Sequence, residues 1–76
     1  MVLFWYQYDM PPKIRELIRD LESAGFRVKS IRGSHRRFAH SSGLRVTVSG
    51  NTGKDAKKYQ IKDVEWAIAE VSDEEK

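Results

Sequence analysis

Residues 26–49 read FRVKSIRGSHRRFAHSSGLRVTVS, and this stretch decides the fold. Three runs within it suit strands: the outer two alternate apolar and polar residues, and the run between them is centred on Phe38. Gly-Ser and Ser-Ser-Gly separate the runs, and such sequences favour turns. We therefore predict an antiparallel meander of three strands, at 26–32, 36–40 and 44–49.

An amphipathic helix is predicted before the strands, from Pro11 to Ala24. Four apolar residues recur there at the i, i+3, i+4, i+7 spacing of one helix face: Ile14, Leu17, Ile18 and Leu21. Pro11 and Pro12 suit the first turn, and Asp9 stands just upstream as a candidate N-cap. Gly25 supplies the left-handed residue that ends such a helix.

A second helix is predicted after the strands, beginning between Asp55 and Tyr59. Its buried stripe consists of Ile61, Val64, Ala67, Ile68 and Val71. Trp66 lies about 140° from Ile61 around the helix, at 100° per residue, and therefore off that stripe. Three placements stay open for Trp66: over the sheet edge, in a protein interface, or as a lone surface aromatic.

This order of elements predicts an α+β domain, helix–three-stranded antiparallel sheet–helix (α-β-β-β-α), in which both helices cover one sheet face. Double-stranded RNA-binding domains share this architecture, and the opposite sheet face stays available for binding. We assign residues 11–71 to the domain and 72–76 to an acidic tail. Residues 1–10 form an apolar extension that could add a strand, stack on RNA bases, dock a partner or simply cover the core.

The size and composition of the chain exclude several classes of protein. A domain of 76 residues has no room for a large cofactor cavity. The chain has no cysteine, which excludes disulfides, thiol nucleophiles and thiolate metal sites and favours a cytoplasmic location. The most apolar stretch, Val2–Tyr8, is far shorter than the ~20 residues of a membrane-spanning helix, so no membrane partner is expected.

Basic residues concentrate in the middle of the chain. Residues 27–62 contain ten lysines and arginines against one acid, a net charge of +9, whereas residues 1–26 carry −1 and residues 63–76 carry −5. A basic segment of this density favours a surface that binds phosphates or an acidic partner. A solvated face with no partner is the alternative interpretation.

The most distinctive local sequence is GSHRRF at 33–38, which places His35 at a turn between two basic strands. Imidazole suits proton transfer near neutral pH, and the neighbouring cations could hold a scissile phosphate. In RNA the nucleophile can be the substrate's own 2′-hydroxyl. His35 is therefore the candidate general base or acid, although a lone histidine at a turn is more often inert.

Other residues near this turn are weaker candidates for a catalytic or metal-binding role. His40 is expected to be structural, and Ser34 points away from His35 and has no acidic partner, so a serine hydrolase is not expected. Two histidines with few acids nearby make a poor metal site, so we expect neither metal nor cofactor. The candidate RNA-binding residues are Lys29, Arg32, Gly33, Ser34, Arg36, Arg37, Arg45, Lys54, Lys57 and Lys58.

Three segments together resemble the HicA toxin family: LESAGF at 21–26, GSHRRFAH at 33–40 and GLRVTV at 43–48. Their order and spacing agree with the family, and a basic loop and a closing helix follow. The likeness covers about residues 12–71. The family often has a second histidine directly after the catalytic one, where this chain has Arg36.

The resemblance implies a double-stranded-RNA-binding-like fold and a ribosome-independent mRNA interferase of a type II toxin–antitoxin system, neutralised by a HicB antitoxin. The family's catalytic histidine maps onto His35. The expected function is therefore a metal-independent endoribonuclease that cleaves mRNA. The alternatives are a non-catalytic double-stranded-RNA-binding module on the same fold and a protein-binding adaptor.

Overall fold

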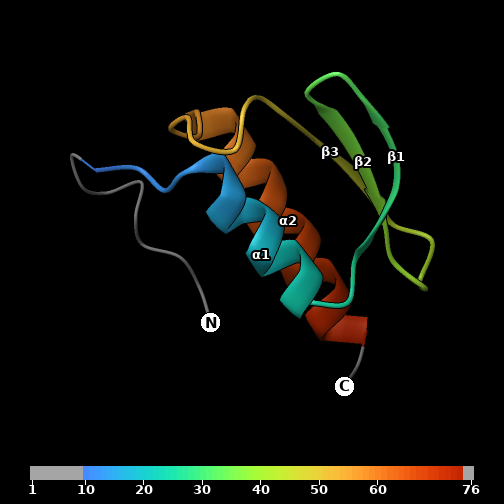
Figure 1. The fold of residues 1–76 in the computed structure, drawn as a ribbon. Coiled ribbons are helices and arrows are strands. Elements are labelled where there is room, and N and C mark those ends of the chain that lie inside the picture. The colour runs from blue at the N-terminus through green and yellow to red at the C-terminus, as the bar shows by residue number, and fades with distance from the viewer. Residues whose placement is uncertain (1–9, 75–76) are drawn as a thin grey trace.

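Two helices and three strands follow one another in the predicted order (Figure 1). The computed structural model describes residues 10–74. The elements are α1 (Ile14–Ser23), β1 (Arg27–Arg32), β2 (His35–Ala39), β3 (Arg45–Ser49) and α2 (Lys58–Glu74). The α+β class and the α-β-β-β-α order are thus confirmed. Apart from Met10, the predicted N-terminal extension lies outside the described residues.

Helix α1 begins three residues later than predicted, because the residues before it pair with the loop that precedes α2. The Pro12 carbonyl accepts a hydrogen bond from the Ala56 N–H at 2.8 Å, and Lys13 forms an isolated antiparallel bridge with Asp55. This pairing holds Lys13 extended rather than helical. The Lys13 N–H donates to the Glu16 side chain at 3.1 Å, which caps the first turn.

Gly25 ends α1 as predicted. Its φ of +98° lies in the left-handed region that glycine adopts without steric cost. The Gly25 N–H donates to the Glu22 carbonyl at 3.1 Å and the Phe26 N–H to the Leu21 carbonyl at 3.0 Å, the two bonds of a Schellman motif. The motif turns the chain directly from α1 into β1.

The sheet has the strand order β1-β2-β3, and both pairings are antiparallel, as the meander requires. A bulge interrupts β1, since Val28 pairs with Phe38 and Ser30 with Arg37, which leaves Lys29 as the extra residue. The bulge shifts the side-chain alternation by one residue. The alternation in the sequence alone gave no sign of it.

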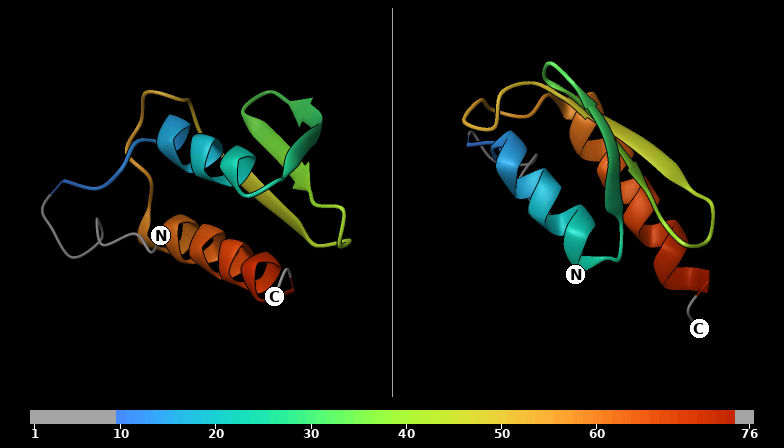
Figure 2. Two further views of the ribbon diagram at one scale, coloured as in Figure 1. Left: turned by 90° about the horizontal axis from the view of Figure 1, so that it is seen from below. Right: turned by 45° about the vertical axis from the view of Figure 1, so that its right-hand side comes forward.

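Both helices lie on the same side of the sheet and run alongside each other (Figure 2). The core between the helices and the sheet contains Ile14, Leu17, Leu21, Phe26, Phe38, Val48, Ala56, Ile61, Val64, Ala67 and Val71. Ile68 is only partly buried, and Trp66 is 56% exposed, off the buried stripe as predicted. Helix α2 continues to Glu74, through the first part of the predicted tail. Within residues 10–74, neither helix is long and apolar enough to cross a membrane.

Candidate nucleic-acid interface

The sheet face that points away from the helices is the face left for binding. Phe38 is buried towards the helices, so the alternate residues His35 and Arg37 point the other way. Their cross-strand partners share that side: Arg32 and Ser49 flank His35, and Ser30 and Thr47 flank Arg37. We call this surface the open face; it comprises Lys29, Ser30, Arg32, His35, Arg37, Arg45, Thr47 and Ser49.

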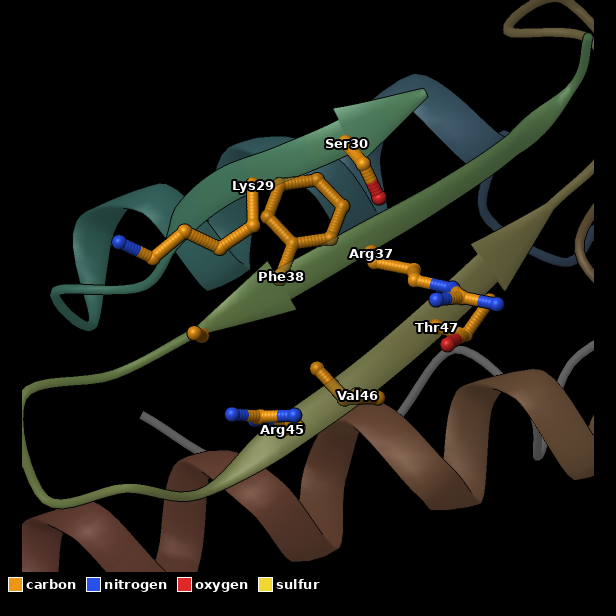
Figure 3. Close-up of a pocket in the computed structure, with 8 residues that line it drawn as sticks. Lys29, Ser30, Arg37, Phe38, Arg45, Val46 and Thr47 are labelled. Atoms are coloured by element: carbon orange, nitrogen blue, oxygen red, sulfur yellow. The ribbon is translucent and has the colours of Figure 1, made fainter. Parts of the chain in front are cut away.

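Cations from all three strands meet on the open face. Lys29 of β1, Arg37 of β2 and Arg45 of β3 line a depression of about 610 Å³. Figure 3 shows these side chains on their three strands. All three side chains are exposed. Within residues 10–74, Lys13 forms an ion pair with Asp55, and no ion pair involves Lys29, Arg37 or Arg45. Their positive charge is therefore available to an anionic ligand.

His35 lies at one end of the open face. It is the first residue of β2, its side chain is exposed, and it lines a depression of about 320 Å³, which we call the histidine depression. Its lining residues are Ser30, Arg32, His35, Arg37 and Thr47. The imidazole Nδ1 shares a hydrogen bond of 2.7 Å with Ser49 Oγ. The structure thus brings the predicted proton carrier and two predicted phosphate-binding arginines into one depression.

Arg36 lies apart from the other predicted cations. It pairs with Val48, on the helix side of the sheet, and is half-buried. Its guanidinium donates to the Gly50 carbonyl at 2.9 Å and to the Ser34 carbonyl at 3.3 Å. This arginine holds the turn before β2 against the end of β3 instead of reaching the open face.

The loop after β3 forms a third depression, of about 380 Å³, which Ser49 at the end of β3 also lines. We call it the loop depression; its polar and aromatic lining residues are Ser34, Ser49, Asn51, Lys54, Asp55, Lys57, Tyr59 and Gln60. Three predicted RNA-binding residues, Ser34, Lys54 and Lys57, therefore lie together here. Lys58 is exposed at the first residue of α2 and does not line this depression.

The turn that presents His35 depends on a glycine. Gly33 has a φ of +59°, and a Cβ added there would meet nothing within 4 Å. Glycine is therefore favoured at this position for its backbone conformation and not for lack of space. The Ser34 carbonyl next to it accepts a hydrogen bond from the Gly50 N–H at 3.2 Å, which closes the end of the sheet beneath His35.

Two residues of the site were not predicted from the sequence. Ser49 contacts His35, and Gln60 holds Ser49: the Gln60 Nε2 donates to the Ser49 carbonyl at 2.7 Å. Gln60 is only 7% exposed, and its Oε1 accepts from the Lys57 N–H at 2.9 Å. A glutamine just before the apolar stripe of α2 was the only signal, and periodicity does not show what such a side chain binds.

His40 lies at the far end of β2 from His35 and has a structural role. Its Nδ1 accepts a hydrogen bond from the Ser42 N–H at 3.0 Å, and its ring lies 5.1 Å from that of Phe26. It therefore fixes a turn and packs on the core, as expected of it. Within residues 10–74, no three potential metal-binding side chains gather in one place.

A family model described as the HicA toxin of bacterial toxin-antitoxin systems matches residues 14–70, three quarters of the chain. The chain belongs to the HicA toxin family. No curated protein matches the sequence. The family match begins with α1 and ends within α2, so it includes the open face, all three depressions and His35 of this HicA toxin.

Proposed function

We propose that this HicA toxin is a metal-independent endoribonuclease, an mRNA interferase, that binds RNA on its open face and uses His35 to move the proton. One observation carries the proposal: an exposed imidazole lines the same depression as Arg32 and Arg37. A phosphodiester bound by these two guanidinium groups would lie beside a group suited to proton transfer.

Cleavage of RNA in this depression needs only groups that are present there, the substrate and water. His35 takes the proton from the 2′-hydroxyl, and the 2′-oxygen attacks the phosphorus. The bond to the 5′-oxygen then breaks, and this oxygen takes a proton from water. The hydroxide that remains takes the proton back from the His35 imidazolium, which restores the neutral base. Arg32 and Arg37 stabilise the negative charge that develops on the phosphoryl oxygens. The products are a 2′,3′-cyclic phosphate and a 5′-hydroxyl.

The remaining cations fit a role in binding the strand on either side of the cut. Lys29 and Arg45 extend the charge along the open face, and Lys54 and Lys57 extend it beyond Ser49. Contacts to several phosphates bind RNA regardless of sequence and place one phosphate at His35. Binding is therefore expected to weaken steeply with salt.

A HicB-type antitoxin would act on the same surface. Acidic side chains of the antitoxin would pair with Arg32, Arg37 and Arg45, and its bulk would cover His35. Inhibition is then electrostatic and steric, and the antitoxin competes with RNA. Replacement of Arg37 by glutamate is expected to weaken both complexes, whereas an antitoxin that binds elsewhere would not respond to this change.

Incubation of the purified toxin with a single-stranded transcript and a chelator tests the proposal. The expected result is cleavage by the wild type, with cyclic phosphate ends, and an intact transcript with the folded His35→Ala variant. A transcript that is bound but not cut would identify a non-catalytic RNA-binding module instead. No affinity for RNA at low salt would favour a protein-binding adaptor.

A further inference from the structure

We propose that Ser49 is the positioning residue for His35, a role that rests on the proposed function. Its Oγ lies 2.7 Å from the imidazole Nδ1. This hydrogen bond fixes the orientation of the ring and leaves Nε2 free for the substrate. The two side chains come from directly paired positions at the end of the β2–β3 ladder, so the sheet itself brings them together.

Ser49 is held from three directions. Its backbone pairs with His35 in the sheet, and its carbonyl accepts a hydrogen bond from the buried amide of Gln60. The next residue, Gly50, is bound by the Arg36 guanidinium at 2.9 Å. The position of the Ser49 hydroxyl is therefore set by the strand, by α2 and by a clamp on the helix side of the sheet, as preorganisation requires.

A hydroxyl suits both forms of the imidazole that take part in proton transfer. The neutral base with a free Nε2 and the imidazolium both carry a hydrogen on Nδ1, and Ser49 Oγ accepts from it in each form. A carboxylate in this place would add a negative charge beside the imidazole, whereas a hydroxyl orients the ring without adding charge. The loss of Ser49 Oγ is therefore expected to slow the cleavage step and to leave RNA affinity unchanged.

The test compares Ser49→Ala with Ser49→Thr, which restores a hydroxyl, and with Ser41→Ala, the same change in the exposed turn at the opposite end of the sheet. Single-turnover cleavage rates and RNA dissociation constants are measured for each. We expect Ser49→Ala to lower the rate about tenfold, with affinity within twofold; the rate loss equals the lower end of that found when the outer partner of a metal-bound histidine is removed. Ser49→Thr and Ser41→Ala should cleave within about threefold of the wild type.

Long-range proton–nitrogen NMR spectra of His35 without RNA give a readout that is independent of cleavage. The share of neutral imidazole with its proton on Nδ1 should fall in Ser49→Ala and recover in Ser49→Thr. An unchanged rate or an unchanged tautomer in Ser49→Ala would overturn the proposal. If the wild type cuts no RNA, the proposed function fails, and the spectra alone decide whether Ser49 positions the ring.

A separate observation, the exposed aromatic ring of Tyr59, points to a nucleobase subsite in the loop depression. Tyr59 is 60% exposed in the first turn of α2 and lines this depression together with Asn51, Lys54 and Lys57. Ser49 lines it too and also contacts His35, so the subsite begins one side chain away from the proposed cleavage centre. We infer that it takes an unpaired base next to the cleaved phosphate.

The chemistry of the loop depression suits a single-stranded nucleotide. An exposed aromatic ring stacks on a base only if that base has left its own helix. Lys54 and Lys57 supply charge for the attached phosphates, and Asp55, the acid of this loop, is already paired with Lys13. The substrate class implied is single-stranded RNA, although the α-β-β-β-α order is shared with domains that bind duplex RNA.

Helix α2 offers a matched control for Tyr59. Trp66 lies seven residues further along, is similarly exposed at 56%, and does not line the loop depression. The dissociation constant of a labelled single-stranded oligoribonucleotide is measured in a His35→Gln background, so that cleavage does not interfere. We expect Tyr59→Ala to weaken binding at least fivefold, the lower end of the loss of one stacked base, and Tyr59→Phe and Trp66→Ala to stay within twofold.

The duplex form of the same oligoribonucleotide should bind equally well with and without Tyr59. An equal loss of affinity in Trp66→Ala would overturn the proposed subsite, as would a Tyr59→Ala variant that binds within twofold of its parent. Neither result would bear on the proposed function. If the parent His35→Gln chain binds no RNA even at low salt, the proposed function fails as well.

Discussion

The Arg36 guanidinium lies 2.9 Å from the Gly50 carbonyl oxygen, so an arginine at the start of β2 holds the residue just after β3. The next residue, Arg37, points to the open face and lines the histidine depression. Two adjacent arginines thus serve different purposes because successive strand residues face opposite sides of a sheet. Arg36 supports the end of the sheet where His35 and Ser49 meet.

This difference predicts that alanine at Arg36 lowers stability, whereas alanine at Arg37 lowers RNA affinity. Arg36→Ala leaves the half-buried Gly50 carbonyl without its donor, while the Ser34 carbonyl keeps the Gly50 N–H, and should cost about 1 kcal/mol of stability. Arg37→Ala should leave the melting temperature nearly unchanged and weaken RNA binding. Thermal melts followed by circular dichroism, together with RNA titrations, measure both. A less stable Arg37→Ala, or an Arg36→Ala with full stability, would contradict the assignment.

If the arginines of the open face bind phosphates, RNA affinity should depend less steeply on salt when one of them is removed. If Arg37 and Arg45 each bind one phosphate, each alanine variant should lower the slope of log affinity against log salt by about 1, as for one lost phosphate contact. Arg19 is exposed on α1, on the helix side of the molecule, and Arg19→Ala serves as the control. An equal change of slope in all three variants would mean that only the net charge matters.

Gly25 and Gly43 form a matched pair for the packing of His40. Both have a φ near +100°, at +98° and +99°, so alanine costs about 1–2 kcal/mol in backbone strain at either position. A Cβ at Gly25 would also lie 3.2 Å from the His40 ring, whereas at Gly43 it meets nothing within 4 Å. Gly25→Ala should therefore lower the unfolding free energy more than Gly43→Ala. Equal losses of unfolding free energy in the two variants, measured by chemical denaturation, would show that the His40 ring moves aside at no energetic cost.

Asp20 predicts a pH-dependent stability. Burial raises the pKa of this carboxyl, nearby Glu16 raises it further, and Arg19 opposes both. Its buried Oδ2 has no hydrogen-bond partner within the described residues. Because the folded state binds the proton more tightly than the unfolded state, stability falls as pH rises through the acid range in which Asp20 ionises.

The substitution Asp20→Asn removes this charge. It should raise the melting temperature at pH 7, and the gain should vanish at acid pH, where Asp20 is protonated in both the folded and the unfolded state. Asp63→Asn, an exposed change on α2, is the control. A gain that persists unchanged at acid pH would point to packing rather than to the charge.

Local sequence patterns predict most of the fold because each element carries its own signal. The 3.6-residue period marks α1, the two-residue period marks β3, and Gly25 marks the end of α1. The start of α1 was wrong by three residues, because Lys13 pairs with a segment more than forty residues away. A contact of that range leaves no trace in a local pattern.

The candidate site, like the fold, could be predicted from the sequence only in part. Residue type and charge density were enough to select His35 and the cations around it. The partner of His35 is fixed by the register of β2 and β3, which places Ser49 opposite it across fourteen residues of chain. The bulge at Lys29 also depends on pairing between strands, so only the assembled sheet shows it. The helix-side placement of Arg36, by contrast, follows from the alternation of β2 about Phe38.

The single-turnover rate of RNA cleavage by wild type and His35→Gln, with chelator and with protein in excess of RNA, tests the central claim most directly. If His35 moves the proton beside a phosphate bound by Arg32 and Arg37, the variant should be slower by at least about 100-fold, with RNA affinity within twofold. A folded His35→Gln protein that cleaves at the wild-type rate would contradict the account.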